Sequence, residues 1–272
     1  MRLLMVSPEH FEVAYGINPH MRAADGSLKH VDRARAAAQW RDLLQTFRGI
    51  GIQVDVLPGA PGLPDMVFAA NHGLPWQNEI ILSRMAHAER REEVPLFRHW
   101  YEGQGYRIHD PFSDGAVDFE GMGDTLWLEP GRSLVGGHGF RTRPEVYQTL
   151  GRRFGFEVAP LKLVSDLFYH LDTCLCLLGP GAAAWVPQAF DAEGAAWIRA
   201  RFQRLIEVDP REAKEGFAAN AYCPDGRHVV VQRGCDRFVR DLSDAGFQTI
   251  EVETGEFIKA GGSVFCLKMA LC

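Results

Sequence analysis

A recurring alternation of short apolar strands with single helices constrains the fold of this chain most strongly. The apolar periodicity predicts helices that begin near residues 31, 90, 143, 191 and 236, and two or three strand-like segments accompany each helix. A repeat of roughly 50 residues is more typical of a radial arrangement of small sheets than of one doubly wound sheet. The sequence therefore predicts an α/β fold of five similar units. A single domain over residues 1–272 is expected, because no Pro- or Ser-rich linker divides the chain.

The predicted strands are short runs of apolar and β-branched residues bounded by turn-forming residues. They lie at residues 2–6, 53–57, 66–70, 79–83, 106–109, 126–129, 133–137, 156–160, 174–179, 182–186, 228–232, 248–252 and 263–271. The predicted helices lie at residues 30–51, 90–103, 143–154, 191–204 and 236–245. Pro95 falls inside the second helix, and proline is best tolerated in a first turn, so a start at Pro95 is the alternative.

Charge and apolar patterning exclude two classes of protein. Lys and Arg number 29 against 35 Asp and Glu, for a formal net charge of -6, whereas an electrostatic nucleic-acid binder needs clustered basic residues. No run of about 18 apolar residues is present, so no membrane span is expected.

The N-terminus and the cysteines indicate the compartment. The chain reaches Pro8 and Glu9 before an apolar segment could form, so no secretory signal is predicted. The six cysteines include no CxxC pair and lack the density of a disulfide scaffold. We therefore expect free thiols in a reducing, cytoplasmic setting.

Cys266 lies in the apolar run SVFCLKMAL near the C-terminus. A cysteine inside an apolar strand is ordinarily a small buried hydrophobic residue. Against that interpretation, Gly261 and Gly262 precede it, and glycines allow a sharp turn or a close approach to a ligand. A nearby Lys259 would lower the pKa of the thiol. Cys266 is therefore a candidate nucleophile.

His170 and Glu120 stand in two further motifs, FYHLDTC at 168–174 and FEGMGD at 119–124. The ordinary reading of His170 is a buried histidine bonded to a carbonyl group. The functional reading is a general acid and base, because histidine titrates near neutral pH. Asp172 would share its face if the segment is extended. Glu120 either belongs to a simple turn or projects into a cleft that the neighbouring glycines leave open.

Together, a cysteine, a histidine and several carboxylates favour a cationic substrate. The surroundings typical of thiol proteases are missing, and Asp65, Asp172 and Glu120 are more negative charge than an amide carbonyl needs. A guanidinium, by contrast, is a planar group of five donors that fits carboxylates.

A metal or a nucleotide cofactor is not expected. His170, Cys174 and Cys176 are too crowded in an extended segment to form a zinc site, and no second ligand pair follows at a suitable spacing. Walker-type and dinucleotide-binding glycine motifs are absent.

Seven motifs in order resemble the guanidine-modifying superfamily of arginine deiminases, dimethylarginine dimethylaminohydrolases and amidinotransferases. They are YGINPHM (15–21), LPDMVFAAN (63–71), DFEGMGD (118–124), GGHGFRT (136–142), FYHLDTC (168–174), NAYC (220–223) and EFIKAGGSVFC (256–266). The set is most similar to the arginine dihydrolases. This resemblance implies a five-bladed α/β propeller, with the active site on its axis and a small guanidino compound such as arginine as substrate.

The resemblance also implies a role for each matching residue. Cys266 would be the nucleophile and His170 the general acid and base, while Glu120 would hold the guanidinium against His170. The implied substrate-binding residues are Asp65, Asn71, Asp172, Asn18, Arg90 and Arg141, with the two arginines as clamps for the α-carboxylate. A surface salt bridge is the alternative for each arginine, and Arg91 is the alternative to Arg90 if the register slips by one.

Asn71 separates the outcomes that the resemblance allows. The position is an aspartate in the deiminases and dimethylaminohydrolases, whereas an amide can hold the neutral ureido group of citrulline for a second attack. A dihydrolase is therefore favoured. The alternatives are a one-step deiminase or dimethylaminohydrolase, an amidinotransferase and a non-catalytic binder of cationic metabolites. His72 and Trp76, which follow Asn71, leave the preferred guanidino compound open, and the sequence also leaves homo-oligomerisation open.

Overall fold

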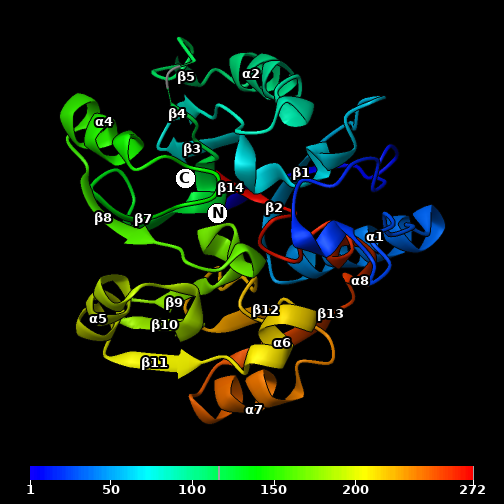
Figure 1. Ribbon diagram of the computed structural model, residues 1–272, viewed down its shortest axis with the longest axis vertical. Coiled ribbons are helices and arrows are strands. Elements are labelled where there is room, and N and C mark those ends of the chain that lie inside the picture. The colour runs from blue at the N-terminus through cyan, green and yellow to red at the C-terminus, as the bar shows by residue number, and fades with distance from the viewer. Residues whose placement is uncertain (116, 272) are drawn as a thin grey trace.

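The computed structural model describes residues 1–115 and 117–271, and these residues form a mixed α/β fold with five small sheets. Figure 1 shows the sheets distributed around the middle of the molecule, with the longer helices outside them. The first sheet consists of β14 (Met269–Leu271), β1 (Arg2–Val6) and β2 (Gln53–Leu57), and its helix is α1 (Arg33–Gly49). The second consists of β3 (Gly73–Trp76), β4 (Glu79–Leu82) and β5 (Arg107–His109) with α2 (Glu93–Gly103), and the third of β6 (Thr125–Glu129), β7 (Ser133–His138) and β8 (Glu157–Lys162) with α4 (Glu145–Phe154). The fourth consists of β9 (Leu175–Gly179), β10 (Ala182–Trp185) and β11 (Arg204–Glu207) with α5 (Ala192–Arg201), and the fifth of β12 (His228–Gln232) and β13 (Gln248–Val252) with α7 (Asp236–Asp244).

Each three-stranded sheet repeats one topology. Its middle strand pairs antiparallel with one neighbour and parallel with the other. The parallel strand is reached through the helix of the unit, because a parallel pair needs a long crossover. In the fifth sheet β12 and β13 are parallel, and an isolated antiparallel bridge from Tyr222 to Val230 takes the place of the third strand. The predicted five similar units are thus present in the described part of the chain.

The two ends of the chain complete one sheet. β1 pairs antiparallel with β14, with Leu3 opposite Ala270, and parallel with β2. The last strand therefore joins a sheet that the first strand begins, and the segment that carries Cys266 is held next to the N-terminal strand.

Helix α1 illustrates why a helix can be predicted from the sequence. The Asp32 side chain accepts a hydrogen bond from Arg35 N (3.0 Å) and caps the first turn. Its buried residues recur at helical spacing and face the core. They are Ala36, Gln39, Trp40, Leu43, Leu44 and Phe47. The second helix begins at Glu93, so Pro95 lies in its first turn, and the predicted starts at residue 90 and at Pro95 were both wrong.

Two strand predictions at the centre of the molecule were wrong. Residues 66–70 belong to two short 3-10 helices, η2 (Pro64–Val67) and η3 (Ala69–His72), which precede the unpredicted strand β3. Of residues 263–271 only Met269–Leu271 form a strand, and Cys266 lies in the turn before it. The other unpredicted strand is β11, part of which was assigned to a helix.

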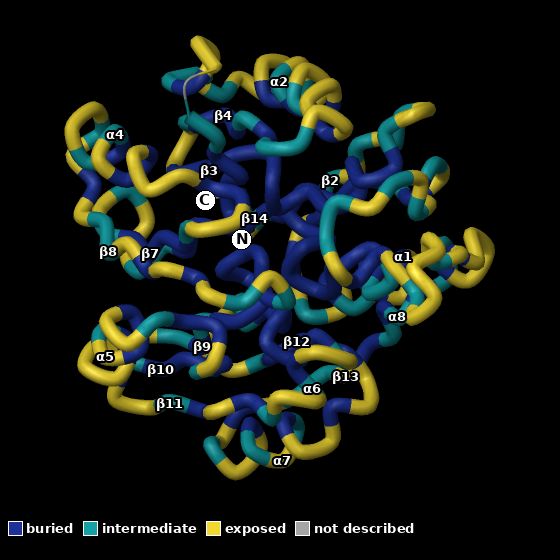
Figure 2. Tube along the Cα trace, in the orientation of Figure 1, coloured by how far each residue is buried: buried dark blue, intermediate teal, exposed yellow. Residues whose placement is uncertain are grey.

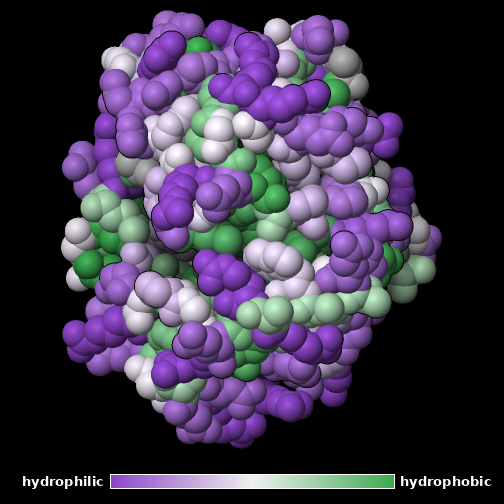
Figure 3. All heavy atoms as spheres, turned by 90° about the vertical axis from the view of Figure 1, so that its left-hand side faces the viewer, coloured by the Kyte–Doolittle hydropathy of each residue, from purple (hydrophilic) through white to green (hydrophobic). Residues whose placement is uncertain are grey.

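The buried residues lie toward the middle of the radial arrangement, and the exposed residues lie toward its outside. Figure 2 shows buried segments through the middle of the molecule and exposed ones on the outer helices α2, α4, α5 and α7. Most of the side shown in Figure 3 is hydrophilic, with smaller hydrophobic areas near its middle. None of the helices in residues 1–115 and 117–271 is both long and apolar enough to cross a membrane.

Candidate active site

The Cys266 thiol is buried between a carboxylate and an amide. It follows α8 (Gly255–Ile258), and the residue is 2% exposed. The sulfur donates to Asp172 Oδ2 (3.2 Å) and accepts a hydrogen bond from Asn220 Nδ2 (3.2 Å). The expected help from Lys259 is absent, because its Nζ bonds the His30 carbonyl group (3.0 Å) and Glu256 (2.6 Å).

The electrostatics of this pair keep the resting thiol protonated. Burial raises the pKa of Cys266 well above its ordinary value, and the neighbouring Asp172 raises it further. Burial also raises the pKa of Asp172 to about 7, against the lowering effects of the Cys266 hydrogen bond and of Lys268. Activation of the sulfur therefore requires an added positive charge or a proton acceptor.

His170 pairs with Glu120 rather than with a carbonyl group. Its Nε2 lies 2.7 Å from Glu120 Oε2, and both side chains are almost completely buried. His170 precedes the 3-10 helix η6 (Leu171–Thr173), so the expected extended segment through Asp172 is wrong. The turn separates the two side chains: His170 faces Glu120, and Asp172 faces Cys266.

Glu120 is the most highly connected carboxylate of the site. It precedes α3 (Gly121–Asp124), and its Oε1 accepts a hydrogen bond from Ala86 N (3.1 Å). Burial alone would raise the pKa of Glu120, but the Arg141 guanidinium and the hydrogen bond with His170 hold it well below its ordinary value. Glu120 is therefore ionised and ready to bind a cation at neutral pH.

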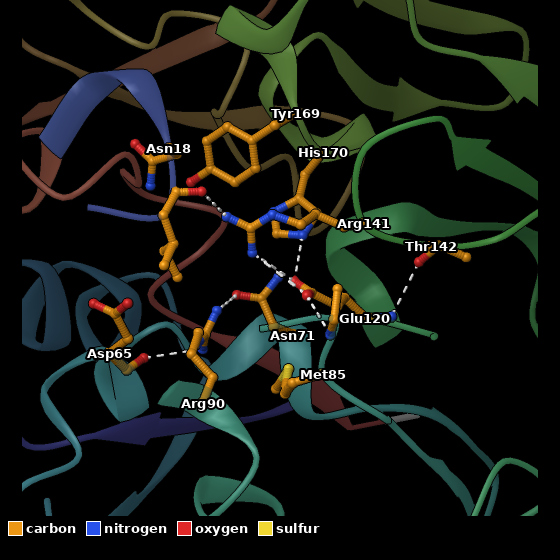
Figure 4. Close-up of polar contacts among 12 residues, drawn as sticks. Asn18, Asp65, Asn71, Met85, Arg90, Glu120, Arg141, Thr142, Tyr169 and His170 are labelled. Carbon is orange, nitrogen blue, oxygen red and sulfur yellow. Dashed lines mark hydrogen bonds and ion pairs between the residues drawn. The ribbon is translucent and has the colours of Figure 1, made fainter. Parts of the chain in front are cut away.

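Arg141 is a buried partner of Glu120, so the surface salt bridge considered for it is wrong. Its Nη1 lies 3.2 Å from Glu120 Oε2, and its Nη2 donates to the Ile17 carbonyl group (3.0 Å). The guanidinium carbon lies 4.7 Å from the centre of the Tyr169 ring. Figure 4 shows Arg141 between Tyr169 and Glu120, beside His170. A guanidinium of the protein itself thus fits this set of groups.

Arg90 is hydrogen-bonded to the two residues Asn71 and Asp65 on its side of the site. It is 3% exposed, so neither the surface salt bridge nor the shift to Arg91 is correct. Its Nη1 donates to Asn71 Oδ1 (3.0 Å) and its Nη2 to the Asp65 carbonyl group (3.1 Å). Glu93 Oε2 accepts from Arg90 Nη2 (2.9 Å) and holds the guanidinium in place. Asn71 lies between Arg90 and Glu120 (Figure 4), with its amide oxygen committed to Arg90.

Asn18 lies at the edge of this group and is half-buried. Its Oδ1 accepts from His20 N (2.9 Å), and its Nδ2 donates to the Ala260 carbonyl group (3.0 Å). The next residue, Gly261, has φ +92, and any side chain there would collide with Asn18 and with the Tyr169 hydroxyl group. Asn18 therefore ties the N-terminal segment to the turn that leads to Cys266.

Gly123 leaves room for the site, and its replacement by alanine should lower turnover at least about 100-fold with the fold retained. A Cβ atom there would overlap Asn71 Nδ2 and lie 3.4 Å from the His170 ring. Release of ammonia from a guanidino compound, the reaction that the sequence resemblance implies, would measure the loss. Gly49→Ala is the matched control, because a Cβ at Gly49 meets nothing within 4 Å. Equal activity of the two variants would contradict the role of Gly123.

Three buried aspartates contribute a stability that falls as the pH rises. Burial raises the pKa of Asp65 and of Asp172 to about 7 from 3.8, and that of Asp124 to about 6. Between the unfolded and the folded pKa, each of these groups keeps a proton that the unfolded chain has released, so its contribution to the free energy of unfolding decreases with pH. Histidines whose pKa values are lowered by burial, such as His20 and His72, contribute in the opposite direction. The contribution is at most about 1.4 kcal/mol per pH unit and group.

Urea unfolding between pH 4 and pH 7 would measure this slope. Asp172→Asn should shift the slope toward more positive values, because the amide does not titrate and the negative contribution of Asp172 is lost. Asp166→Asn is the control, since Asp166 is not among the buried residues. A slope that is the same for Asp172→Asn and the wild type would contradict the raised pKa.

Sequence reasoning missed Asn220, Tyr169 and Glu93. Asn220 opens the NAYC motif, so the motif itself was the available signal. Tyr169 adjoins His170, and its hydroxyl group donates to the Gly261 carbonyl group (2.6 Å). Glu93 stands in the charged stretch after Arg90 and gives no local sign that it is buried.

Of the other described cysteines, Cys174 contacts the site through the backbone of His170, since its thiol donates to the His170 carbonyl group (3.7 Å). Cys174, Cys176, Cys223 and Cys235 are free thiols, and Cys272 lies outside the described residues. Over residues 1–115 and 117–271, no three His, Cys, Asp or Glu side chains are arranged to hold a metal ion.

Comparisons with known proteins identify relatives of this chain. The family model described as N,N dimethylarginine dimethylhydrolase, eukaryotic, matches residues 7–272. The chain is 37% identical over 271 residues to the bifunctional arginine dihydrolase/ornithine cyclodeaminase AgrE of Nostoc sp., covering 99% of this chain and 37% of AgrE. It is 35% identical over 270 residues to the N(G),N(G)-dimethylarginine dimethylaminohydrolase of Mycobacterium tuberculosis, covering 99% of this chain and 85% of that protein.

A solved structure is also closely similar. It is the N-terminal domain of ArgZ, an arginine dihydrolase from the ornithine–ammonia cycle in cyanobacteria, in a cysteine-to-serine mutant bound to substrate. The TM-score is 0.91 at 36% identity, and the match covers 98% of this chain and 97% of that one. The chain thus spans one domain of the ArgZ type but only 37% of the length of the bifunctional AgrE.

Proposed function

Because the chain belongs to the N,N dimethylarginine dimethylhydrolase family, we propose that it is a cysteine-dependent guanidine hydrolase that converts arginine to ornithine, ammonia and carbon dioxide. One observation carries this proposal. A buried thiol, a histidine–carboxylate pair and an amide line one site: Cys266, His170 with Glu120, and Asn71. The similarity to AgrE and to the substrate-bound ArgZ domain supports arginine as the substrate.

The fold supports the same proposal. Five repeated units with a sheet closed by the two chain ends are what a five-bladed α/β propeller requires, and we propose that residues 1–272 form one catalytic domain of this kind. The site residues lie in the segments that connect the sheets. In a propeller these segments meet near the centre, where all five units can contribute residues to one site. The free thiols favour a reducing compartment, so we place the protein in the cytoplasm.

The guanidinium of the substrate binds between Glu120 and Asp172. Glu120 is ionised, and a bound cation favours the ionised form of Asp172, whose pKa of about 7 makes it sensitive to charge. Asp65 is 2% exposed, and burial raises its pKa to about 7. In its ionised form it adds a further negative charge to the binding site. The α-carboxylate binds to Arg90 or Arg141, and Asn18 adds a polar contact at the edge.

The first round replaces one nitrogen by sulfur. As the cation arrives, the Cys266 sulfur passes its proton to Asp172 Oδ2, which it contacts at 3.2 Å, and attacks the guanidinium carbon, which gives a tetrahedral adduct; the proton returns to the sulfur when the sulfur departs. His170, held by Glu120 at 2.7 Å, gives a proton to the departing ammonia. A covalent amidino-thioester cation remains on Cys266. His170 then takes a proton from water, which attacks the same carbon and releases citrulline.

The second round depends on Asn71. Arg90 donates to Asn71 Oδ1, so the Nδ2 group must point the other way, and Nδ2 makes no hydrogen bond within the described residues. A Cβ at Gly123 would meet both Nδ2 and the His170 ring, so Nδ2 lies beside the general acid. There it donates to the neutral ureido oxygen of citrulline and retains it. A second displacement and a second hydrolysis then give ornithine, ammonia and carbon dioxide.

Product analysis tests the proposal. The purified protein is incubated with arginine, N(G),N(G)-dimethylarginine and other guanidino acids, and ammonia, citrulline and ornithine are measured together. Ornithine with two ammonia per arginine is the expected result. Citrulline as the only product would contradict a dihydrolase. Turnover that requires an added amine acceptor would indicate an amidinotransferase, and binding of arginine without turnover would indicate a non-catalytic binder.

The second candidate is a dimethylarginine dimethylaminohydrolase. The family model and the Mycobacterium tuberculosis relative favour it, since that relative bears this name. It would use the same residues and release citrulline and dimethylamine after one round. A higher kcat/KM for N(G),N(G)-dimethylarginine than for arginine would establish this function instead.

A further inference from the structure

Asn220 lies in the NAYC segment, away from the sequence neighbours of every proposed site residue, and its side chain is completely buried. Its backbone N–H group bonds the Phe217 carbonyl group (2.8 Å), and its carbonyl group accepts from Phe265 N (2.9 Å). The residue is therefore fixed next to the turn that carries Cys266.

Every hydrogen-bonding position of the Asn220 amide is used. Oδ1 accepts from Ser263 N (2.9 Å) and from Cys266 N (3.3 Å). Nδ2 donates to the Asp172 carbonyl group (2.9 Å) and to Cys266 Sγ (3.2 Å). An amide offers two acceptor positions and two donors, so no capacity remains for another role.

The orientation of this amide follows from its partners. A reversed amide would direct Oδ1 at the Asp172 carbonyl oxygen and Nδ2 at the N–H groups of Ser263 and Cys266. Both arrangements are repulsive, so the nitrogen must face the sulfur. Asn220 therefore presents a donor to the reacting atom.

The two polar neighbours of the sulfur act in opposite directions. Asp172 accepts the thiol proton and favours the protonated sulfur, whereas a donor to sulfur favours the thiolate. We propose that Asn220 is a further catalytic residue, which donates an amide hydrogen to Cys266 and stabilises its sulfur as a thiolate during activation and each time the sulfur departs. This inference rests on the proposed role of Cys266 as the nucleophile.

The other titratable groups around the sulfur belong to separate elements, and all of them are retained when Asn220 is replaced. Asp172 and Tyr169 interact with Cys266, and Lys268 and Glu120 interact with Asp172. Replacing Asn220 also removes its lowering effect on the pKa of Asp172, a change that makes this neighbour less negative and therefore favours the thiolate. Slower alkylation in Asn220→Ser, which adds no charge, thus reports the lost donor, and Asn220→Asp combines that loss with a new negative charge.

The test measures thiol chemistry without substrate. The rate of iodoacetamide alkylation at Cys266 is followed from pH 6 to pH 11 by peptide mass spectrometry, in the wild type, Asn220→Ser and Asn220→Asp. Ser263→Ala is the matched control, because it removes a buried hydrogen bond to Thr254 (2.6 Å) in the same turn without a side-chain contact to the sulfur. Circular dichroism and thermal unfolding establish that each variant is folded.

Both Asn220 variants should alkylate at least about tenfold more slowly at a fixed pH, because the thiolate fraction falls, and the midpoint should move to higher pH. Ser263→Ala should match the wild type. Coincident profiles for the wild type and both Asn220 variants, or an equal shift in Ser263→Ala, would overturn the proposal.

A second measurement covers the case in which the Asn220 variants do not fold. In wild-type protein labelled with 15N-asparagine, one side-chain amide signal should titrate with the alkylation midpoint of Cys266 and stay constant in Cys266→Ser. No titrating amide signal would refute the contact. Turnover retained by Cys266→Ser would instead refute the proposed function, so the two failures are distinguishable.

Discussion

Cys266→Ser should lower the turnover of arginine by at least about four orders of magnitude, because a hydroxyl group cannot replace the thiolate as nucleophile. The serine side chain keeps a donor for Asp172 Oδ2 and an acceptor for Asn220 Nδ2, so the local hydrogen bonds survive. Arginine should still bind, because the carboxylates and arginines are unchanged. Ornithine and ammonia release measure the turnover, and calorimetry measures binding.

Cys223→Ser is the matched control for this variant. Cys223 is half-buried, and its thiol donates to the Leu178 carbonyl group (3.4 Å), a bond that serine can also make. It should retain wild-type turnover. Full activity of Cys266→Ser would show that Cys266 is not the nucleophile, whatever the activity of Cys223→Ser.

Asn71→Asp should change the product rather than abolish the reaction. The new carboxylate still accepts from Arg90 Nη1 through one oxygen, as Asn71 Oδ1 does at 3.0 Å. Its second oxygen replaces the Nδ2 donor and faces the ureido oxygen of citrulline, which it repels. Ornithine formation should fall at least about 100-fold while citrulline accumulates, because a site that loses a required donor discriminates strongly.

Chromatography of the amino acids over a full time course measures this change. Asn78→Asp is the control, since Asn78 is exposed in the turn between β3 and β4, where its side chain donates to the Gly105 carbonyl group (2.9 Å) and bonds no residue of the site. An unchanged ratio of ornithine to citrulline in Asn71→Asp would show that the amide does not direct the second round.

The parts of the fold that depend on local pattern were predictable from the sequence. Helix α1 has both an N-cap at Asp32 and an apolar stripe, and β12 contains three consecutive valines. Such elements bury their own side chains wherever they pack, so their positions follow from neighbouring residues in the chain.

The turns that build the site were not predictable in this way. The turn at Cys266 depends on Asn220, 46 residues earlier, whose Oδ1 bonds the backbone of Ser263 and Cys266. The short helix η2 places its Asp65 carbonyl group against Arg90, 25 residues later. An apolar run reads locally as a strand, and only these distant hydrogen bonds bend it into a turn.

Motif resemblance recovered the site residues because it carries information about distant pairing. Arg90 and Arg141 look like surface residues by local composition, yet each is buried against a carboxylate, Glu93 or Glu120. Asn220 was not predicted as a site residue, because the NAYC motif that contains it suggested no chemistry. Its role emerges only from its position beside the sulfur.

The fate of the guanidino carbon tests the central claim most directly. The wild-type protein is mixed with arginine labelled at this carbon, and the label is followed in protein, citrulline and carbon dioxide. The expected result is transient label on the peptide that contains Cys266, followed by recovery of the label as carbon dioxide together with unlabelled ornithine. Label that ends in citrulline, or that never appears on this peptide, would contradict two rounds of attack by Cys266.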